Sequence, residues 1–238
     1  MKASTILKGI VALALIGVIV WAIRLGQQRR EQFEQQTAGT TPGHVAKVGP
    51  GAIRVDGAAG DWERIGEFNL AAETGSARSA NDWESVRLAH DGTNLYALIA
   101  LPYALEDRAP AGKGTAILGQ VFIDTDPGAS TADPTGMGGF YVGVDRSILV
   151  LIRRAGQGEP ACVEYRVERT ASAGTGFEKV ENGTASSCDG RPAAGYEGNN
   201  VELALALPLL GLRTGRRVRF VLEPMGGSQI RELELRIP

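Results

Sequence analysis

The feature that most constrains the fold is a repeated pattern of short apolar or alternating runs, separated by glycine, asparagine or aspartate. The pattern begins near Gly51 and continues to the end of the chain, and no amphipathic helical segment of normal length interrupts it. Runs of this length between turn residues are typical of β-strands. The 32 glycines outnumber all aromatic residues together, which favours many turns over a helical bundle. The sequence therefore predicts an all-β fold.

About ten strands are expected, and a single open sheet of that width would leave a long face uncovered. We therefore expect a two-sheet antiparallel sandwich. The clearest hairpin joins Val86–His90 to Asn94–Leu101 through a turn that contains Gly92, because glycine supplies the positive φ that such a turn needs. The other expected strands are Ile53–Val55, Gly119–Asp124, Phe140–Asp145, Ile148–Arg153, Cys162–Val167, Val201–Leu207, Val218–Glu223 and Glu232–Ile237.

The amino terminus carries an apolar segment of 15 uncharged residues, Gly9–Ile23, between Lys8 and Arg24. If Lys8 reaches the lipid headgroups, the segment extends backwards by two apolar residues and is long enough for a short membrane span. A cleaved signal peptide has an apolar region of similar length and is the alternative. We favour a retained transmembrane anchor, because Trp21 suits the membrane interface. The flanking positive charges are balanced and do not set the orientation.

The chain is expected to have three parts: a transmembrane anchor with a juxtamembrane helix over residues 1–36, a flexible linker over 37–50, and a β-sandwich domain over 51–238. Within the anchor, Gly9, Ala12 and Gly17 lie in one sector of the helix, where a second membrane helix can approach, although such residues are common in membrane helices. Beyond residue 36 the chain has 20 basic and 25 acidic residues, a net charge of −5. This charge argues against nucleic acid as a partner.

One acidic cluster is a candidate metal site. Asp124 and Asp126 alternate at the end of an expected strand, so their carboxylates point to the same side, and Asp133 is placed to return after the following turn. Hard oxygen ligands that converge on a turn suit Ca²⁺. An EF-hand is excluded, because Gly128 and Thr135 occupy positions where oxygen ligands belong. The alternative is that these aspartates cap turns by binding local backbone amides.

Six short motifs occur in order along the chain: Ile53-Arg-Val-Asp-Gly57, Gly60-Asp-Trp62, Asp82-Trp83, Asp91-Gly-Thr-Asn-Leu-Tyr96, Val121-Phe-Ile-Asp-Thr-Asp-Pro-Gly128 and Val201-Glu-Leu-Ala-Leu-Ala-Leu-Pro208. In order and spacing they resemble DOMON-like domains of the family-nine carbohydrate-binding-module type over roughly 180 residues. The resemblance implies a jelly-roll-like sandwich that is usually exported. It also implies a single-pass protein of the inner membrane, with its carboxyl-terminal domain in the periplasm or outside, and calcium is compatible with it.

Export changes how the remaining candidate residues are interpreted. Cys162 and Cys188 are the only cysteines, and a disulfide between them would stabilise the domain by about 3.5 kcal/mol on the chain-entropy estimate. Trp62 and Trp83 are the only tryptophans outside the anchor. They are candidate platforms for stacking a sugar ring, or else buried residues at the ends of the sandwich.

We expect no enzymatic activity, because the chain has no nucleophile elbow, no metalloprotease motif and no phosphate loop. The first hypothesis is a non-catalytic accessory subunit that its transmembrane helix attaches to integral membrane proteins, in a complex such as a respiratory or photosynthetic one. The second, which the resemblance alone implies, is a tethered carbohydrate-binding module for cell-envelope glycans. A third, implied by relatives of this sandwich that hold haem b, is a haem b-binding electron-transfer domain, for which the nominal ligands are Met137, Met225, Lys113 and His90.

Overall fold

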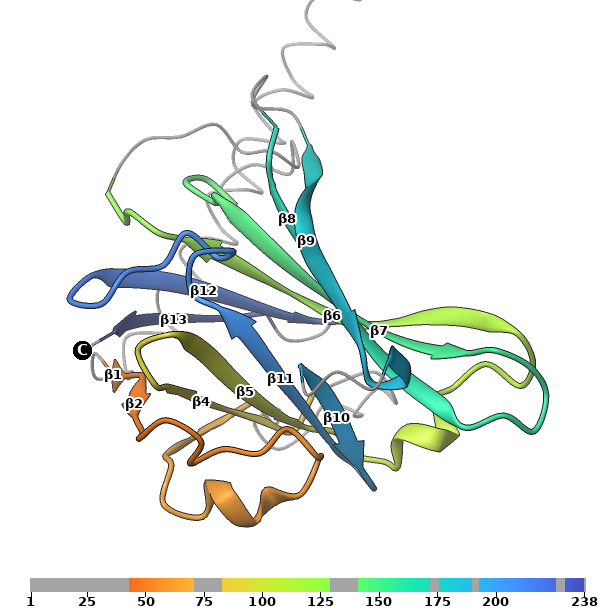
Figure 1. Ribbon diagram of the computed structural model, residues 1–238. Helices are drawn as coiled ribbons and strands as arrows, with labels where there is room; N and C mark the ends of the chain where they lie inside the picture. The colour runs from red at the N-terminus through yellow and green to blue at the C-terminus, as the bar shows by residue number, and fades with distance from the viewer. Residues whose placement is uncertain are drawn as a thin grey trace, which may run out of the picture.

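Two β-sheets pack face to face in the computed structural model of the protein, which describes residues 43–70, 83–128, 141–171, 176–189, 193–225 and 230–237 (Figure 1). The predicted all-β class and two-sheet sandwich are confirmed for this part of the chain. The only helices within these ranges are three short 3₁₀ turns: η1 (Ala59–Trp62), η2 (Leu105–Asp107) and η3 (Ser187–Asp189).

The larger sheet has seven strands in the order β1-β13-β12-β6-β7-β8-β9. The smaller sheet has the order β10-β11-β5-β4-β2, and β3 also pairs with β4. Their bounds are β1 (Gly43–His44), β2 (Ala46–Lys47), β3 (Glu67–Asn69), β4 (Ser85–His90), β5 (Asn94–Ala100), β6 (Gly114–Asp124), β7 (Arg146–Arg154), β8 (Ala161–Thr170), β9 (Phe177–Ser186), β10 (Ala194–Glu197), β11 (Asn200–Ala206), β12 (Arg217–Pro224) and β13 (Arg231–Arg236).

Every strand pair is antiparallel except β1 with β13 and β2 with β4, which are parallel. The predicted hairpin is confirmed in β4 and β5, with Gly92 at φ +91° in its turn. The Asp91 carboxylate completes this turn by accepting hydrogen bonds from the backbone N–H groups of Thr93 and Asn94, at 2.8 and 2.7 Å.

Alternate residues of both sheets build one core between the layers. Val86 and Leu88 of β4 face inward, as do Val150 and Ile152 of β7, and all four are buried in the same apolar cluster. Two hydrogen bonds join the layers at polar atoms inside this core. The Tyr165 hydroxyl donates to the carbonyl of Ala204 at 3.1 Å, and the Trp83 indole donates to the carbonyl of Leu118 at 3.0 Å.

Each sheet also carries a smaller apolar cluster on its outer face. Residues 51–65 run across the outer face of the smaller sheet, at the bottom of Figure 1, and bury Ile53, Trp62 and Ile65 against it. On the outer face of the larger sheet, Tyr141 and Val144 precede β7 and pack on residues of β6 and β12. Residues 51–65 and the turn at Tyr141–Val144 each position one candidate site.

The folded domain begins earlier than the sequence predicts. Residues 43–48, which we call the strap, lie in the segment expected to be a linker, but β1 pairs with the larger sheet and β2 with the smaller one. Val45, between the two strands, is completely buried in the main core. The strap therefore crosses between the edges of both layers, and residues 43–48 are part of the sandwich instead of the expected linker.

Two expected strands are absent from the described residues. Ile53–Val55 packs its side chains against the smaller sheet, but its backbone joins no strand, so the apolar pattern there reflects packing alone. Residues 141–145, the described part of the strand expected at Phe140–Asp145, form a turn with Gly143 at φ +86°. Five strands were not expected: β1, β2, β3, β9 and β10.

Candidate functional site

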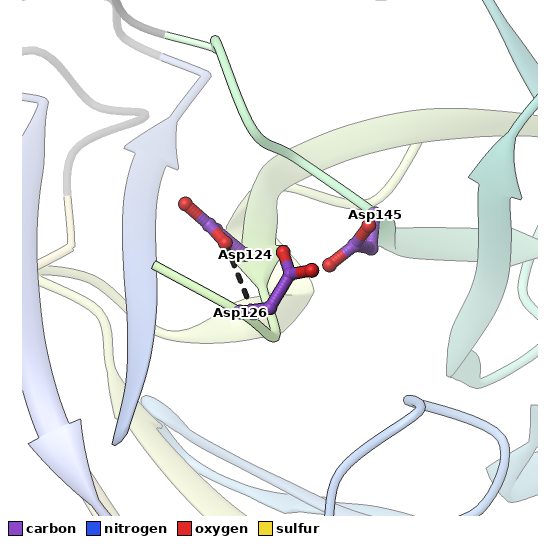
Figure 2. A group of neighbouring side chains, drawn as sticks. All are labelled: Asp124, Asp126 and Asp145. Carbon is purple, nitrogen blue, oxygen red and sulfur yellow. Dashed lines mark hydrogen bonds between the residues drawn. The ribbon is translucent and has the colours of Figure 1, made fainter. Parts of the chain in front are cut away.

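Three aspartates meet where β6 leads toward β7. Asp124 is the last residue of β6, Asp126 lies in the turn that follows, and Asp145 immediately precedes β7 (Figure 2). One carboxylate oxygen from each lies within 4.8 Å of those of the other two. Asp124 and Asp126 were predicted for this cluster, whereas Asp133 lies outside the described residues.

Asp145 is the member that sequence reasoning missed. Its backbone N–H donates to the carbonyl of Ile123 at 2.8 Å, which continues the antiparallel ladder of β6 and β7. The two strands were both predicted, and pairing them as a hairpin would have pointed to Asp145. The error came from placing a strand at residues 140–145, where the chain turns instead.

Hydrogen bonds already engage two of these carboxylates. Asp124 is buried, and its Oδ2 accepts from Nη2 of Arg219 at 3.0 Å and from Nε at 3.1 Å, while its Oδ1 accepts from the backbone N–H of Asp126 at 3.2 Å. Oδ2 of Asp145 accepts from the backbone N–H and the hydroxyl of Thr125, at 2.8 and 2.5 Å. These bonds match the alternative in which the aspartates cap turns.

The electrostatics of the cluster combine burial with one compensating cation. Burial raises the pKa of Asp124, and the Arg219 guanidinium opposes that shift. Arg219 Nη2 also donates to the carbonyl of Val142, so the pair holds the turn before β7 in place. A Cβ on Gly143 would lie 2.7 Å from Asp124 Oδ2, so the turn approaches the carboxylate closely because this residue is glycine.

A cation at this cluster would find one exposed carboxylate, that of Asp126, and one unengaged oxygen of Asp145. Ca²⁺ takes six to eight oxygen ligands, so backbone carbonyls or water would have to supply the rest. The donor set suits a hard cation, although Arg219 competes for Asp124. The calcium expectation remains a prediction.

The two tryptophans do not form stacking platforms. Trp62 is completely buried in η1, and Trp83 is buried between the sheets. A sugar ring stacks only on an exposed aromatic face, so the prediction of Trp62 and Trp83 as ligand-binding residues is wrong. Both are buried, as the alternative interpretation expected, but Trp62 lies on the outer face of the smaller sheet instead of at an end of the sandwich.

Trp62 instead helps to anchor residues 51–65 through a buried glutamate. Glu202 lies on the outer face of β11 and accepts hydrogen bonds from the Trp62 indole, from the backbone N–H of Asp56 at 2.8 Å and from that of Gly57 at 2.5 Å. Burial raises the pKa of Glu202, and these hydrogen bonds oppose the shift. Gly57 has φ +91°, and a Cβ there would collide with the backbone of Tyr196.

Beside this anchored segment, a hollow of about 530 Å³ opens on the outer face of the smaller sheet. Its wall is residues 51–56, its floor includes Tyr96 of β5 and Ala204 of β11, and Asn94 lies at the end of β5. The Tyr96 hydroxyl donates to Asp91 at 2.8 Å, which fixes the ring in the floor. The volume lies within the range of small-molecule sites. Sequence reasoning missed this hollow, because it depends on how residues 51–56 lie across the sheet.

The predicted disulfide between Cys162 and Cys188 is confirmed, with a Cα–Cα distance of 5.6 Å. It joins the start of β8 to η3, which follows β9, and β9 is an edge strand of the larger sheet. The bridge therefore fastens the far end of this edge strand to its neighbour.

The nominal haem ligands do not converge in the described residues. His90 is completely buried, whereas Met225 and Lys113 are exposed, and Met137 lies outside the described residues. The apolar space enclosed between the sheets is about 20 Å³, far below the volume of a cofactor pocket. This geometry gives no support to the haem hypothesis.

The membrane-anchor predictions, including the packing residues Gly9, Ala12 and Gly17, lie outside the described residues. Among the residues that the structure does describe, no helix is long and apolar enough to cross a membrane. No protein-family model, curated protein or solved structure matches this chain. The resemblance to DOMON-like domains therefore remains a prediction from the motifs.

Proposed function

We propose that the chain is an exported, membrane-tethered accessory subunit whose jelly-roll-like sandwich is a non-catalytic scaffold outside the cytoplasm. The observation that carries this proposal is the disulfide between Cys162 and Cys188. Disulfides persist in oxidising compartments such as the periplasm and are rare in the cytosol. In this proposal the apolar segment Gly9–Ile23 is a retained inner-membrane anchor with the domain on its outer side.

The partners in this proposal are integral membrane proteins of a larger complex, such as a respiratory or photosynthetic one. The transmembrane helix makes the contact, with Gly9, Ala12 and Gly17 in the sector that allows close approach. The scaffold role is supported by the way the described residues use their polar groups. The buried carboxylates Asp124 and Glu202 hold neighbouring segments in place and are occupied by structural hydrogen bonds.

The test is purification of the native protein from its own membranes in mild detergent, followed by mass spectrometry of all co-purifying proteins. A stoichiometric set of integral membrane proteins supports the proposal. A control replaces Gly9–Ile23 with an unrelated leucine-rich span, which is expected to keep the protein in the membrane and to lose the partners. A native protein that purifies alone, or whose two thiols react with maleimide without prior reduction, contradicts the proposal.

A second candidate function is a tethered module for cell-envelope glycans, and the hollow beside residues 51–56 favours it. Arg54, Asp56 and Asn94 offer a cation, a carboxylate and an amide around the same hollow. Such groups exchange hydrogen bonds with sugar hydroxyls, and the Tyr96 ring lies in the floor.

This candidate is tested by titrating the full chain with soluble fragments of envelope glycans in a calorimeter. Asn94→Ala is expected to weaken binding about fivefold, because one lost hydrogen bond between neutral groups costs about 1 kcal/mol. Arg217→Ala is the matched control, since Arg217 lies on the larger sheet with its side chain 75% exposed. Unchanged binding by the Asn94 variant, or no binding by the wild-type protein, rules the hollow out as a glycan site.

A further inference from the structure

His90 is a buried polar side chain that lies beside the strap. It is the last residue of β4 and is completely buried. Neither ring nitrogen has a hydrogen-bond partner among the described residues. A buried imidazole in this position is held in its neutral form, because burial disfavours the charged form and no hydrogen bond from the described residues compensates it.

The strap covers this histidine with few interactions. Lys47 of β2 is the register partner of His90, and the backbone N–H of Val48 donates to the carbonyl of His90 at 2.9 Å. On the other side, the backbone N–H of Val45 donates to the carbonyl of Arg236 at 3.0 Å. Because β1 and β2 contain two residues each, the strap depends on the burial of Val45 and on the packing of the partly buried Ala46 and Val48 against the smaller sheet.

The charged groups near His90 do not favour its protonation. Lys47, from β2, adds a repulsive positive charge, and Asp91, from the turn after β4, partly offsets it. The register neighbour on β5 is Leu95. The inward-facing residues at this end of the larger sheet are the apolar Val218, Leu235 and Ile237. Burial, followed by Lys47, lowers the pKa of His90.

We propose that His90 and the strap form an acid-sensitive latch, in which protonation of His90 releases residues 43–48 from both sheets while the rest of the sandwich stays folded. The direction of the pH dependence follows from comparing His90 with the strap open and with the strap closed. With the strap open, His90 takes up a proton near its ordinary pKa of about 6.5, whereas with the strap closed it stays neutral. The closed state is therefore fully stable above pH 6.5 and loses stability as the pH falls below it.

Uptake of one proton raises the opening equilibrium about tenfold between pH 7.5 and pH 5.5. Opening frees six residues, which adds about 20 Å of extended chain at the amino-terminal end of the domain. Where the chain is tethered as proposed above, the sandwich gains that distance from the membrane. The latch itself does not depend on the proposed tether. The gain in distance from the membrane does depend on it.

The test is amide hydrogen exchange on the full chain in detergent micelles at pH 7.5 and 5.5, corrected for intrinsic exchange rates. The opening equilibrium reported by the Val45 and Val48 amides is expected to rise about tenfold at pH 5.5, while the amides of Val150 and Val163 stay unchanged. His90→Leu is expected to abolish the rise. His44→Gln is the matched control, because His44 is the only other histidine and is exposed on β1. This variant should keep the rise in the opening equilibrium at pH 5.5.

An equal rise in the His90→Leu variant, or no rise in the wild-type protein, overturns the latch. A second measurement needs no variant of His90, and it serves if the leucine variant does not fold. The two imidazoles are titrated by NMR in the wild-type chain, with the His44→Gln variant used to assign the signals. His90 must titrate below pH 6.5 in the closed state. A titration of His90 at or above pH 6.5 in the closed state contradicts the proposal.

Discussion

Glu202 and Asp124 are buried carboxylates on the outer faces of the two sheets, and each holds a segment that covers its face. Within the described part of the chain, the donors to Glu202 are neutral N–H groups of residues 56–62. Asp124 accepts from a charged guanidinium, and Arg219 in turn donates to the carbonyl of Val142 in the turn before β7. Glu202 thus holds residues 56–62 directly, whereas Asp124 holds the turn before β7 through Arg219 of β12.

The difference predicts different responses to mutation. Removing one of three neutral donors leaves Glu202 with two, so each donor matters through its own packing and hydrogen bond. Removing Arg219 leaves Asp124 buried with a charge that its cation no longer offsets, which is the costly way to break a buried pair.

Trp62→Ala is expected to lower the free energy of unfolding by about 3 to 5 kcal/mol, because it removes a completely buried aromatic side chain and one donor to Glu202. Urea denaturation measures the change, and limited proteolysis should show new cleavage within residues 51–65. Tyr103→Ala is the control, because its side chain is half-exposed and its loss should cost under about 1 kcal/mol. A loss under 1 kcal/mol for Trp62→Ala would show that this covering is not an integral part of the fold.

Arg219→Ala is expected to cost about 3 kcal/mol, because Asp124 loses its charge partner in a buried position. Asp124→Asn in the same background should recover part of this loss, since it removes the uncompensated charge. Arg217→Ala, on the same strand, should cost less than about 0.5 kcal/mol, because its pair with Glu234 is exposed. Equal effects of the two arginine variants in urea denaturation would contradict the role assigned to Arg219.

Glu202→Gln is expected to cost about 1 to 2 kcal/mol, because the amide keeps the shape of the side chain but places an NH₂ group against N–H donors. Hydrogen exchange should rise at the amides of Asp56 and Gly57 and stay unchanged on β7. The matched control is Glu197→Gln, at an exposed position of β10. If both glutamine variants are equally stable, the hydrogen bonds to Glu202 contribute nothing measurable.

Asp126→Asn is expected to change stability by less than about 0.5 kcal/mol in the presence of a chelator, since its carboxylate is exposed. Adding Ca²⁺ should raise the Tm of the wild-type protein, because a ligand that binds only the folded state stabilises it. The variant should lose this rise, whereas Asp107→Asn, at an exposed position of η2, should keep it. A Tm that does not respond to Ca²⁺ in the wild-type protein would exclude the predicted calcium site.

The sequence predicts those strands whose own residues alternate between apolar and polar. The apolar alternation of β4, β5 and β11 produces strands because alternate side chains fill the core. The edge strand β9 was missed because its exposed positions, Lys179, Glu181 and Asn182, break the apolar pattern. The strands β1 and β2 were missed because two residues are too few to show a period.

In the candidate site, too, residues close in the sequence were predicted and residues far apart in the sequence were missed. Asp124 and Asp126 were predicted together because they are two residues apart at one strand end. Asp145 joins them only through the register of β6 with β7, and Glu202 meets Trp62 from 140 residues away in the chain. No local pattern encodes such a distant pairing. Trp62 was therefore predicted to bind a ligand, whereas its indole donates to Glu202.

The pairing of β1 with β13 has a consequence for the order in which the chain is connected. Gly43 lies opposite Leu235, so the first and last described strands are neighbours in the larger sheet. A few added residues would join these ends, and the exposed turn at 157–160 between β7 and β8 offers a place to open the chain. Such a circular permutant would keep every strand pair of the sandwich and would present its new ends at a different position on the surface from the strap.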